Sequence, residues 1–229
     1  ALKIDADYAD AHNNLGVVLK KLGQLDEAIE SYEKAIAINP VEADTYNNLG
    51  IVFDEKEQLD EAIQSYHKAV SIQPDLAEAY NNLGHTLCKI HRYQEAVVSY
   101  EKVFDIKPNL DYIVGNILNT KMNCNNWNGL AELLVDAKHR IINNEKVIEP
   151  FHLMGLIDDP ALQRKAQRLR ISEDHPKSSI LHAIDRYPKH PKIHIGYFSA
   201  DFREHPVGFL TAELYEIHDR EHFEIHAFS

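Results

Sequence analysis

His205 is the residue of this 229-residue chain that is best placed to take part in chemistry. It follows a short apolar run at 192–198 and comes immediately before Pro206, which suits the first turn of a helix. The N–H groups and dipole at a helix N-terminus attract anions such as a diphosphate, and the same field disfavours a charged imidazolium. A neutral His205 is able to act as a base or a hydrogen-bond partner. The alternative is that His205 only caps the helix, because no glycine-rich phosphate loop accompanies it.

A second histidine pattern lies at 218–222, where His-Asp-Arg-Glu-His formally fits the H-x-x-E-H motif of one group of zinc peptidases. Zinc binding requires both histidines on one face of a continuous helix, together with a third ligand. Here the segment lies at a helix end that runs into a strand, and Asp219 and Arg220 resemble turn residues. Cys88 and Cys124 have no close ligand pairing and are predicted to be reduced thiols of a cytoplasmic protein. We therefore expect no metal site.

The elements that must position His205 form a β-loop-α-β unit. Residues 192–198 predict a short central strand, 199–205 a loop at its C-terminal end, and Pro206 the start of a helix. A second strand is predicted over 223–228. A crossover of this kind makes the two strands parallel and the connection right-handed. Because two parallel strands do not form a stable sheet alone, we expect the domain to be truncated in this chain.

The first half of the chain is organised by a repeat of 34 residues. The sequence Asn-Asn-Leu-Gly begins at positions 13, 47 and 81, and small, aromatic and proline positions keep the same step. These columns are Gly16, Gly50 and Gly84; Ala28, Ala62 and Ala96; Tyr32, Tyr66 and Tyr100; and Pro40, Pro74 and Pro108. A period of 34 with these residue types is the signature of the tetratricopeptide repeat, or TPR.

Each repeat predicts a helix hairpin. The expected helices cover about 9–22 and 25–38, then 43–56 and 59–72, then 77–90 and 93–106, while residues 1–5 match the end of a preceding repeat. Glycine and alanine allow the two helices of a hairpin to pack closely, tyrosine fills the gap to the next hairpin, and proline ends the second helix. Because one hairpin cannot bury its apolar face alone, the hairpins must stack into a superhelix with a concave groove.

An asparagine column recurs in the first helix of each repeat. Asparagine is a poor residue for a helix interior, and the first helices line the concave surface of this architecture. A side-chain amide there offers a donor and an acceptor to the backbone of an extended peptide. The alternative is that these side chains only bridge neighbouring helices; the preceding asparagines, Asn13, Asn47 and Asn81, are interpreted as packing or solvated positions. The predicted peptide-binding residues are Asn14, Asn48, Asn82 and Asn116.

Residues 111–191 are predicted to form a degenerate repeat and a helical bridge. A helix over about 111–122, a loop and a second helix over about 129–143 begin as a fourth repeat and lose its pattern. A further helix from Pro160 to about 171 carries a basic face, expected to be a solvated or interdomain surface: Arg164, Lys165, Arg168 and Arg170. The Pro- and His-rich linker 172–191 marks a boundary. Three parts result, namely 1–110, 111–191 and 192–229.

Charge and hydropathy exclude two classes of partner. The net charge is −12, and residues 1–110 carry 10 Lys and Arg against 19 Asp and Glu. An acidic repeat array repels phosphate backbones, so nucleic acid is not expected as a partner. No apolar run approaches the roughly 18–20 residues that span a bilayer, so no membrane segment is expected either. The predicted location is the cytoplasm.

Residues 193–206 closely resemble the opening of the catalytic region in protein O-GlcNAc transferases, in particular the bacterial TPR proteins of the SPINDLY family. The family pattern is a strand, then Ser-x-Asp-Phe-x-x-His-Pro, then a helix. The residues that supply it are Ser199, Asp201, Phe202, His205 and Pro206. Residues 121–127, 150–151 and 159–163 are similar to the bridge between repeats and catalytic region in those proteins.

The resemblance implies a mainly α TPR superhelix followed by the start of a Rossmann-like α/β catalytic domain of GT-B type. Enzymes of this family are inverting and metal-independent, and they move a sugar, here GlcNAc from UDP-GlcNAc, to Ser or Thr hydroxyls of proteins. By resemblance, His205 lies in the active site near the sugar and is the proposed base, while Asp201 shapes its loop. The asparagine column corresponds to the ladder that binds the acceptor peptide. Animal members often have a second His where this chain has Phe209.

Two points stay open at the level of sequence. In the family, the nucleotide-binding half lies beyond the position of residue 229, so the chain alone is not expected to catalyse. Plant relatives transfer fucose from GDP-fucose, so the donor sugar is either GlcNAc or fucose. The alternative from another class is a TPR scaffold for protein–protein interaction whose α/β residues have no enzymatic role.

Overall fold

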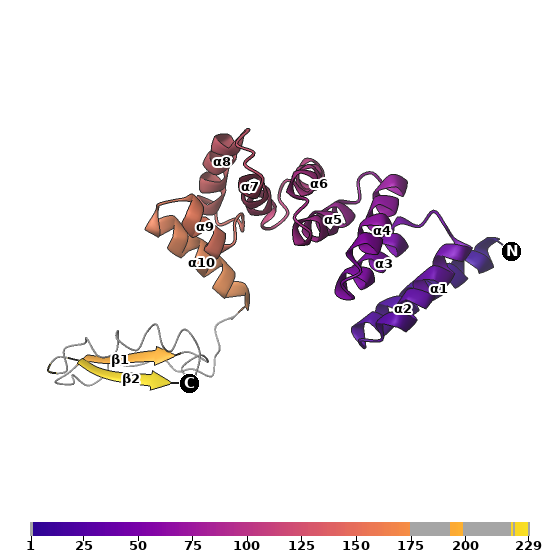
Figure 1. The fold of residues 1–229 in the computed structure, drawn as a ribbon, viewed down its shortest axis with the longest axis horizontal. Coiled ribbons are helices and arrows are strands. Elements are labelled where there is room, and N and C mark those ends of the chain that lie inside the picture. The colour runs from indigo at the N-terminus through magenta and orange to yellow at the C-terminus, as the bar shows by residue number, and fades with distance from the viewer. Residues whose placement is uncertain (1, 175–192, 199–220, 222, 229) are drawn as a thin grey trace. The chain divides into compact units, whose positions relative to one another are not determined.

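The computed structural model describes residues 2–174, 193–198, 221 and 223–228 (Figure 1). The chain divides into two compact units, residues 1–177 and 178–229. Helices α1 to α10 belong to the first unit, and strands β1 and β2 belong to the second. Each unit is described by itself.

Three helix pairs follow one another in the first unit, side by side along the chain (Figure 1). They are α1 (Leu2–Lys21) with α2 (Leu25–Ile38), α3 (Ala43–Glu55) with α4 (Leu59–Ile72), and α5 (Ala77–Lys89) with α6 (Tyr93–Ile106). The predicted hairpins are confirmed, and all their bounds except the start of α1 agree with the structure to within one residue. No described helix is both long enough and apolar enough to cross a membrane.

Helix α1 is longer than its sequence pattern predicts. It was expected to begin near residue 9 after a separate preceding segment, but it is one continuous helix from Leu2. One period before Pro40 the chain has Ala6, which is a strong helix former. The prolines of this column end α2, α4 and α6 because they lack an N–H and clash with a continuing helix. Without a proline at position 6, the helix continues.

The glycine and tyrosine columns meet inside each hairpin. A Cβ atom added to Gly50 would lie 2.6 Å from Cε1 of Tyr66, and the corresponding pairs in the other two hairpins give the same distance. Tyr32 also packs with Leu49 and Val52 of the next hairpin. The prediction that tyrosine fills the gap between hairpins is therefore incomplete, because the ring also fills the space left by the glycine of its own hairpin.

The turns inside the hairpins repeat as well. Gly23, Glu57 and His91 occupy the same position of the repeat and have φ values of 76°, 60° and 61°. In each turn the following N–H donates to a carbonyl five residues earlier, as from Gln24 to Leu19 at 3.0 Å. This is the Schellman arrangement that ends helices, and it reverses the chain in very few residues.

The remaining helices are α7 (Ile113–Asn123), α8 (Leu130–Ile142), α9 (Pro150–Leu156) and α10 (Pro160–Asp174). The segment before α9 crosses the start of α7: the N–H of Gly115 donates to the Val147 carbonyl at 2.9 Å, and a Cβ on Gly115 would lie 2.9 Å from Cα of Ile148. Leu118, Ile141 and Leu153 are buried in one core that joins these helices.

The second unit contains β1 (Ile193–Phe198) and β2 (Phe223–Phe228), which pair in parallel. Ile193 lies opposite Phe223 and Phe198 lies opposite Phe228. Both strands and their relative direction agree with the sequence-based prediction. The loop and helix predicted over 199–220 lie outside the described residues.

Candidate functional site

The first helices of the hairpins, α1, α3 and α5, present their asparagine pairs along one surface, which we call the first-helix face. Nδ2 of Asn48 donates to Oδ1 of Asn13 at 3.1 Å, and Nδ2 of Asn82 donates to Oδ1 of Asn47 at 3.0 Å. Each bond joins the first helix of one hairpin to the first helix of the next. The bridging interpretation of the asparagines is thus correct for this contact, and Asn13 and Asn47 are its acceptors rather than packing or solvated residues only.

Bridging leaves part of each amide free. A primary amide has two N–H groups and one oxygen, and Asn48 and Asn82 each use a single N–H in the bridge. Within the described part of the chain, no donor lies on Oδ1 of either residue. Both side chains are half-buried, whereas Asn14 is exposed. The bridge therefore fixes the orientation of an amide that still offers a donor and an acceptor to a backbone.

A cavity of about 240 Å3 opens on the first-helix face between α3 and α5. Its lining combines amides, apolar side chains and one ion pair: Asn47, Ile51, Ala77, Glu78, Asn81, Asn82, Lys107 and Leu110. Nζ of Lys107 lies 2.5 Å from Oε1 of Glu78, and this hydrogen bond lowers the pKa of Glu78. Such a cavity suits one small side chain of a peptide whose backbone runs along the amides.

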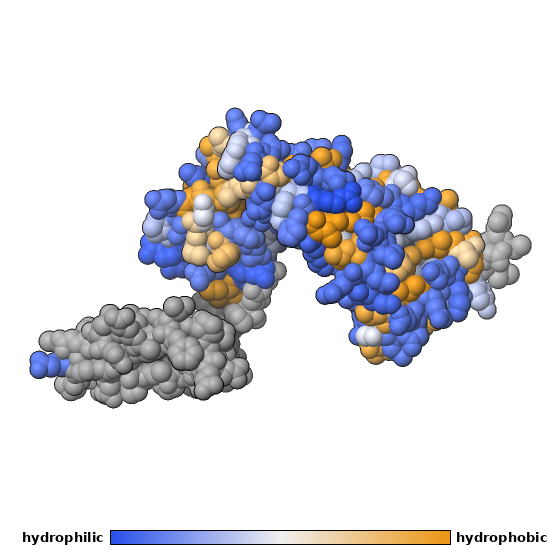
Figure 2. Space-filling model, in the orientation of Figure 1, coloured by the Kyte–Doolittle hydropathy of each residue, from blue (hydrophilic) through white to orange (hydrophobic). Residues whose placement is uncertain are grey.

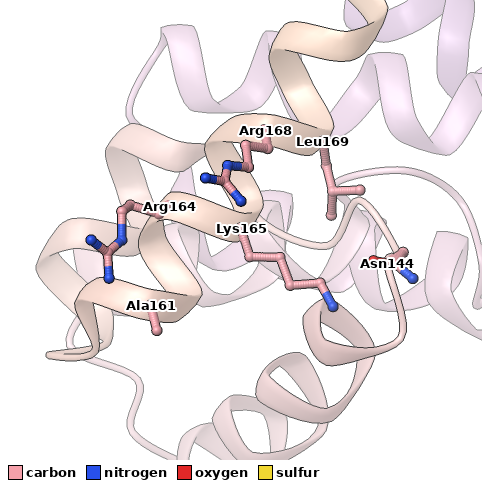
Figure 3. Close-up of a pocket in the computed structure, with 6 residues that line it drawn as sticks. All are labelled: Asn144, Ala161, Arg164, Lys165, Arg168 and Leu169. Atoms are coloured by element: carbon pink, nitrogen blue, oxygen red, sulfur yellow. The ribbon is translucent and has the colours of Figure 1, made fainter.

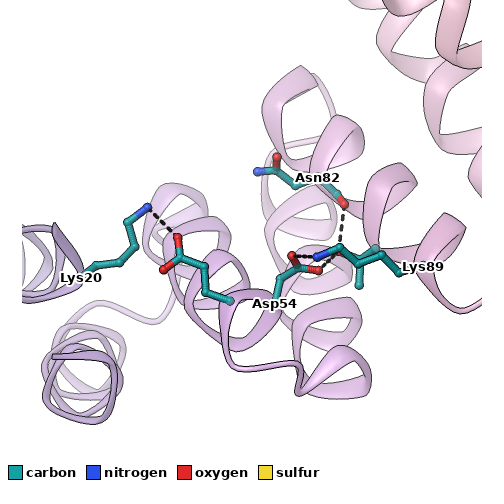
Figure 4. A network of polar contacts seen from close by, with 6 residues as sticks. Lys20, Asp54, Asn82 and Lys89 are labelled. Carbon is teal, nitrogen blue, oxygen red and sulfur yellow. Dashed lines mark hydrogen bonds and ion pairs between the residues drawn. The ribbon is translucent and has the colours of Figure 1, made fainter. Parts of the chain in front are cut away.

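Ion pairs connect the same three helices at their other end (Figure 4). Nζ of Lys20 on α1 lies 3.5 Å from Oε1 of Glu55 on α3, and Asp54 pairs with Lys89 on α5. Oγ1 of Thr86 lies 2.7 Å from Oδ1 of Asp54 and is buried. These contacts, like the amide bridges, hold the hairpins in a constant relative position.

The rings of His85 and Tyr100 lie beside this network. His85 is partly exposed, and its ring meets the edge of Tyr100 with a centroid distance of 5.5 Å. Desolvation lowers the pKa of His85, and the nearby Lys89 lowers it further, while Asp54 opposes the shift. The lowered pKa favours the neutral form of His85.

The fourth predicted ladder residue does not continue the bridges. In the part of the chain that the structure describes, neither Asn81 nor Asn116 forms a side-chain hydrogen bond. Helix α7 starts after Tyr112, which has a φ of 64°, and Gly115 is held against the segment before α9. These contacts place α7 differently from α3 and α5. Asn116 therefore has the periodic spacing of Asn48 and Asn82 but does not form their amide bridge.

The predicted catalytic residues His205 and Asp201 lie outside the described residues, as does most of the 218–222 pattern. The basic face of α10 belongs to the described residues, and its four cations have two different environments. Nη1 of Arg170 lies 3.3 Å from Oε1 of Glu149, and its guanidinium lies over the ring of Tyr112. The other three cations line a cavity. No cluster of His, Cys, Asp and Glu suited to a metal ion occurs among the described residues.

Sequence reasoning missed two parts of this surface. It did not identify Asn13 and Asn47 as acceptors, although the doubled asparagine was the available signal. It also missed Lys107, which reaches Glu78 from the end of α6. The spacing of these two residues has no relation to the 34-residue period, so no pattern pointed to the pair.

Sequence profiles of the tetratricopeptide repeat match residues 9–40 and 77–110, and two further TPR profiles match 52–90 and 31–64. Together they cover the three hairpins. No curated protein matches the chain in sequence.

Solved structures with a similar fold include two TPR domains and MamA. The first TPR of Spaghetti, bound to an HSP90 peptide, is 21% identical with a TM-score of 0.51 and covers 52% of this chain and 95% of that one. The Arabidopsis OM64 TPR domain is 22% identical with a TM-score of 0.50 and covers 52% and 98%. The crystal structure of MamA is 21% identical with a TM-score of 0.52 and covers 76% and 84%. These likenesses concern the fold alone, and the matched profiles show that residues 9–110 consist of tetratricopeptide repeats.

Proposed function

We propose that the first-helix face binds an extended polypeptide and that the chain is the N-terminal part of a protein O-glycosyltransferase to which this polypeptide is the acceptor. The observation that carries the first half is the amide of Asn82, which is oriented by Asn47 beside the 240 Å3 cavity, while no donor among the described residues lies on its oxygen. A similar fold, the first TPR of Spaghetti, was solved with an HSP90 peptide bound.

The enzymatic half of the proposal is supported by the pattern Ser-x-Asp-Phe-x-x-His-Pro at 199–206. The parallel pairing of β1 with β2 on either side of it is compatible with the Rossmann-like GT-B domain that the pattern implies. Neither His205 nor Asp201 belongs to the described residues, so their roles come from the sequence resemblance. We assign the reaction to the cytoplasm, where unpaired Cys88 and Cys124 would stay reduced.

In the proposed reaction, an acceptor Ser or Thr hydroxyl loses its proton to His205 as its oxygen bonds to the anomeric carbon of the sugar. The bond from that carbon to the diphosphate breaks, and the nucleoside diphosphate leaves. By the family resemblance, Asp201 would shape the loop that carries His205. The donor is UDP-GlcNAc, with GDP-fucose as the second candidate, and the reaction uses no metal cofactor.

The test is to incubate the full-length protein with cell proteins and either nucleotide sugar, and to measure the intact mass of the products. A mass increase with UDP-GlcNAc supports the proposal, and an increase with GDP-fucose instead changes the donor. His205→Ala in the full-length protein should abolish most transfer while the thermal unfolding temperature stays the same. Unchanged turnover in this variant would remove His205 from the chemistry.

The peptide-binding half is tested separately with any acceptor found in this way. Asn48→Ala combined with Asn82→Ala should weaken acceptor binding by about tenfold, because each amide loses a donor and an acceptor. Asn109→Ala, at an exposed position after α6, is the matched control. If the double variant binds the acceptor as the parent does, the asparagines serve packing only.

A scaffold without catalysis is the second candidate, and the likeness to TPR domains favours it because those structures cover only 52% of this chain. The two candidates differ in a simple outcome. A scaffold retains peptide binding on the first-helix face and gives no product with either donor sugar.

A further inference from the structure

Helix α10 borders a cleft with a strongly basic lining (Figure 3). The cleft has a volume of about 580 Å3 and is lined by Asn144, Ala161, Arg164, Lys165, Arg168 and Leu169. Three of these side chains are cationic, and no acidic side chain is among them. Lys165 extends toward the loop that carries Asn144, and its Nζ donates to the Ile142 carbonyl at the end of α8. We call this site the α10 cleft.

The charges of Arg164 and Arg168 are not balanced locally. Among the residues that the structure describes, neither guanidinium has an ion pair. Three carboxylates in this part of the chain have other partners. Glu145 binds Arg140 with a 2.7 Å contact, and Glu149 binds Arg170. Asp159 accepts from backbone N–H groups at the start of α10, at 2.9 and 3.2 Å.

Arg164 and Arg168 form a pair of like charges on α10. Arg164 and Arg168 are four residues apart in a helix, so their side chains are neighbours on one face and repel each other. The chain as a whole is acidic, with a net charge of −12, so a cluster of cations without acidic partners stands out. Two adjacent guanidinium groups beside a cleft are well suited to bidentate pairing with carboxylates.

An apolar surface adjoins the α10 cleft. A second cavity of about 350 Å3 shares Arg164 with it and is otherwise lined by Pro150, Phe151, Met154, Pro160, Gln163 and Gln167. Phe151 and Met154 are 78% and 58% exposed, which is unusual for large apolar side chains that lie close together. Figure 2 shows apolar patches set among hydrophilic side chains over this end of the helical unit.

We propose that the α10 cleft and the adjoining Phe151–Met154 surface form a docking site for an acidic polypeptide segment. Carboxylates of the segment pair with Arg164 and Arg168, and an aromatic side chain packs on Phe151 and Met154. A polypeptide is favoured over a nucleic acid because the exposed apolar side chains of Phe151 and Met154 match an aromatic side chain next to a carboxylate. This site is separate from the first-helix face and does not depend on the proposed reaction.

The test measures fluorescence anisotropy of a labelled glutamate-rich peptide with one phenylalanine, titrated with the full-length protein at low salt. The double variant Arg164→Gln, Arg168→Gln should lower the affinity by about tenfold or more. The matched control removes two exposed cations from the repeats, Arg92→Gln with Lys102→Gln, and should leave the affinity unchanged. Thermal unfolding checks that the variants fold, which we expect because Arg164 and Arg168 are exposed.

The aromatic contact is tested with a second pair of changes. Phe151→Ala should weaken binding several-fold, and the same peptide with alanine in place of its phenylalanine should show no further loss with this variant. Equal affinity of the parent and the Arg164→Gln, Arg168→Gln variant would overturn the proposal. So would tighter binding of a single-stranded oligonucleotide than of the peptide, since the site would then recognise phosphate.

Discussion

The three hairpins of residues 9–110 are joined by one set of contacts used repeatedly, whereas residues 111–174 pack through contacts that occur only once. In the hairpins, Gly16, Gly50 and Gly84 each lie against a tyrosine ring, 2.6 Å from an added Cβ, and each internal turn has a left-handed residue. In the second region, Gly115 contacts the backbone of Ile148, a contact with no counterpart in the repeats. A repeated interface can be extended hairpin by hairpin, while a unique contact ends the array and covers its last apolar face.

Because the hairpins repeat, residues of one column have similar environments inside the array. A residue at the end of the array lacks the neighbouring hairpin and has a different environment. Leu15, Leu49 and Leu83 occupy one column and are 46%, 7% and 2% exposed. Leu49 packs with Tyr32 of the preceding hairpin, and α1 has no described hairpin before it. Substitutions in this column therefore distinguish the contribution of stacking to stability from the contribution of the helix itself.

The largest expected effect is in this leucine column. Leu83→Ala should lower the free energy of unfolding by about 3 kcal/mol, because it leaves a cavity in a packed interface. Leu15→Ala should lower it by less than about 1 kcal/mol, because its side chain is already half in water. Chemical denaturation measures both, and equal losses would show that stacking does not depend on this column.

The next effect compares two glycines, one in each region. Gly50→Ala should lower the free energy of unfolding by about 2 kcal/mol, because the new methyl group would overlap the ring of Tyr66. Gly155→Ala in α9 should leave the free energy unchanged or raise it by up to about 1 kcal/mol, since nothing lies within 4 Å of its added Cβ and alanine favours a helix. The same denaturation curves decide, and a loss at both positions would contradict the close approach in the hairpin.

The smallest effect concerns the asparagine column. Asn82→Ala should lower the free energy of unfolding by about 1 kcal/mol relative to Asn116→Ala, because only Asn82 forms a bridge to the preceding repeat. Alanine is the better helix former at both positions, so this gain cancels in the comparison. Thermal unfolding of the two variants provides the measurement. If they unfold alike, the bridge between Asn82 and Asn47 adds no stability.

Much of the first region could be predicted from the sequence because its contacts recur with the period of the chain. The bounds of α2 to α6 and the glycine and tyrosine columns follow from the 34-residue step and from the conformational limits of proline. The early start of α1 departs from the period at Ala6, where the terminating proline is absent.

The contacts within the candidate sites depended more strongly on tertiary structure than the helix bounds did. The period placed Asn48 and Asn82 on the first helices, but only the stacking of α3 and α5 decided that each amide donates to the first asparagine of the preceding repeat. The sequence likewise predicted a basic face on α10, while packing decided that Arg170 binds Glu149 and that Arg164 and Arg168 border a cleft.

The physical reason is the range of the interactions involved. A repeat contacts only its neighbours, so its main packing contacts, such as that of Gly50 with Tyr66, recur with the same residue types in every period. The sequence alone therefore determined that this chain forms TPR hairpins. A contact such as Lys107 with Glu78, or Gly115 with Ile148, joins residues with no periodic relation. The two residues of such a contact meet only when the helices that carry them pack together. These contacts were therefore decided by the tertiary structure alone.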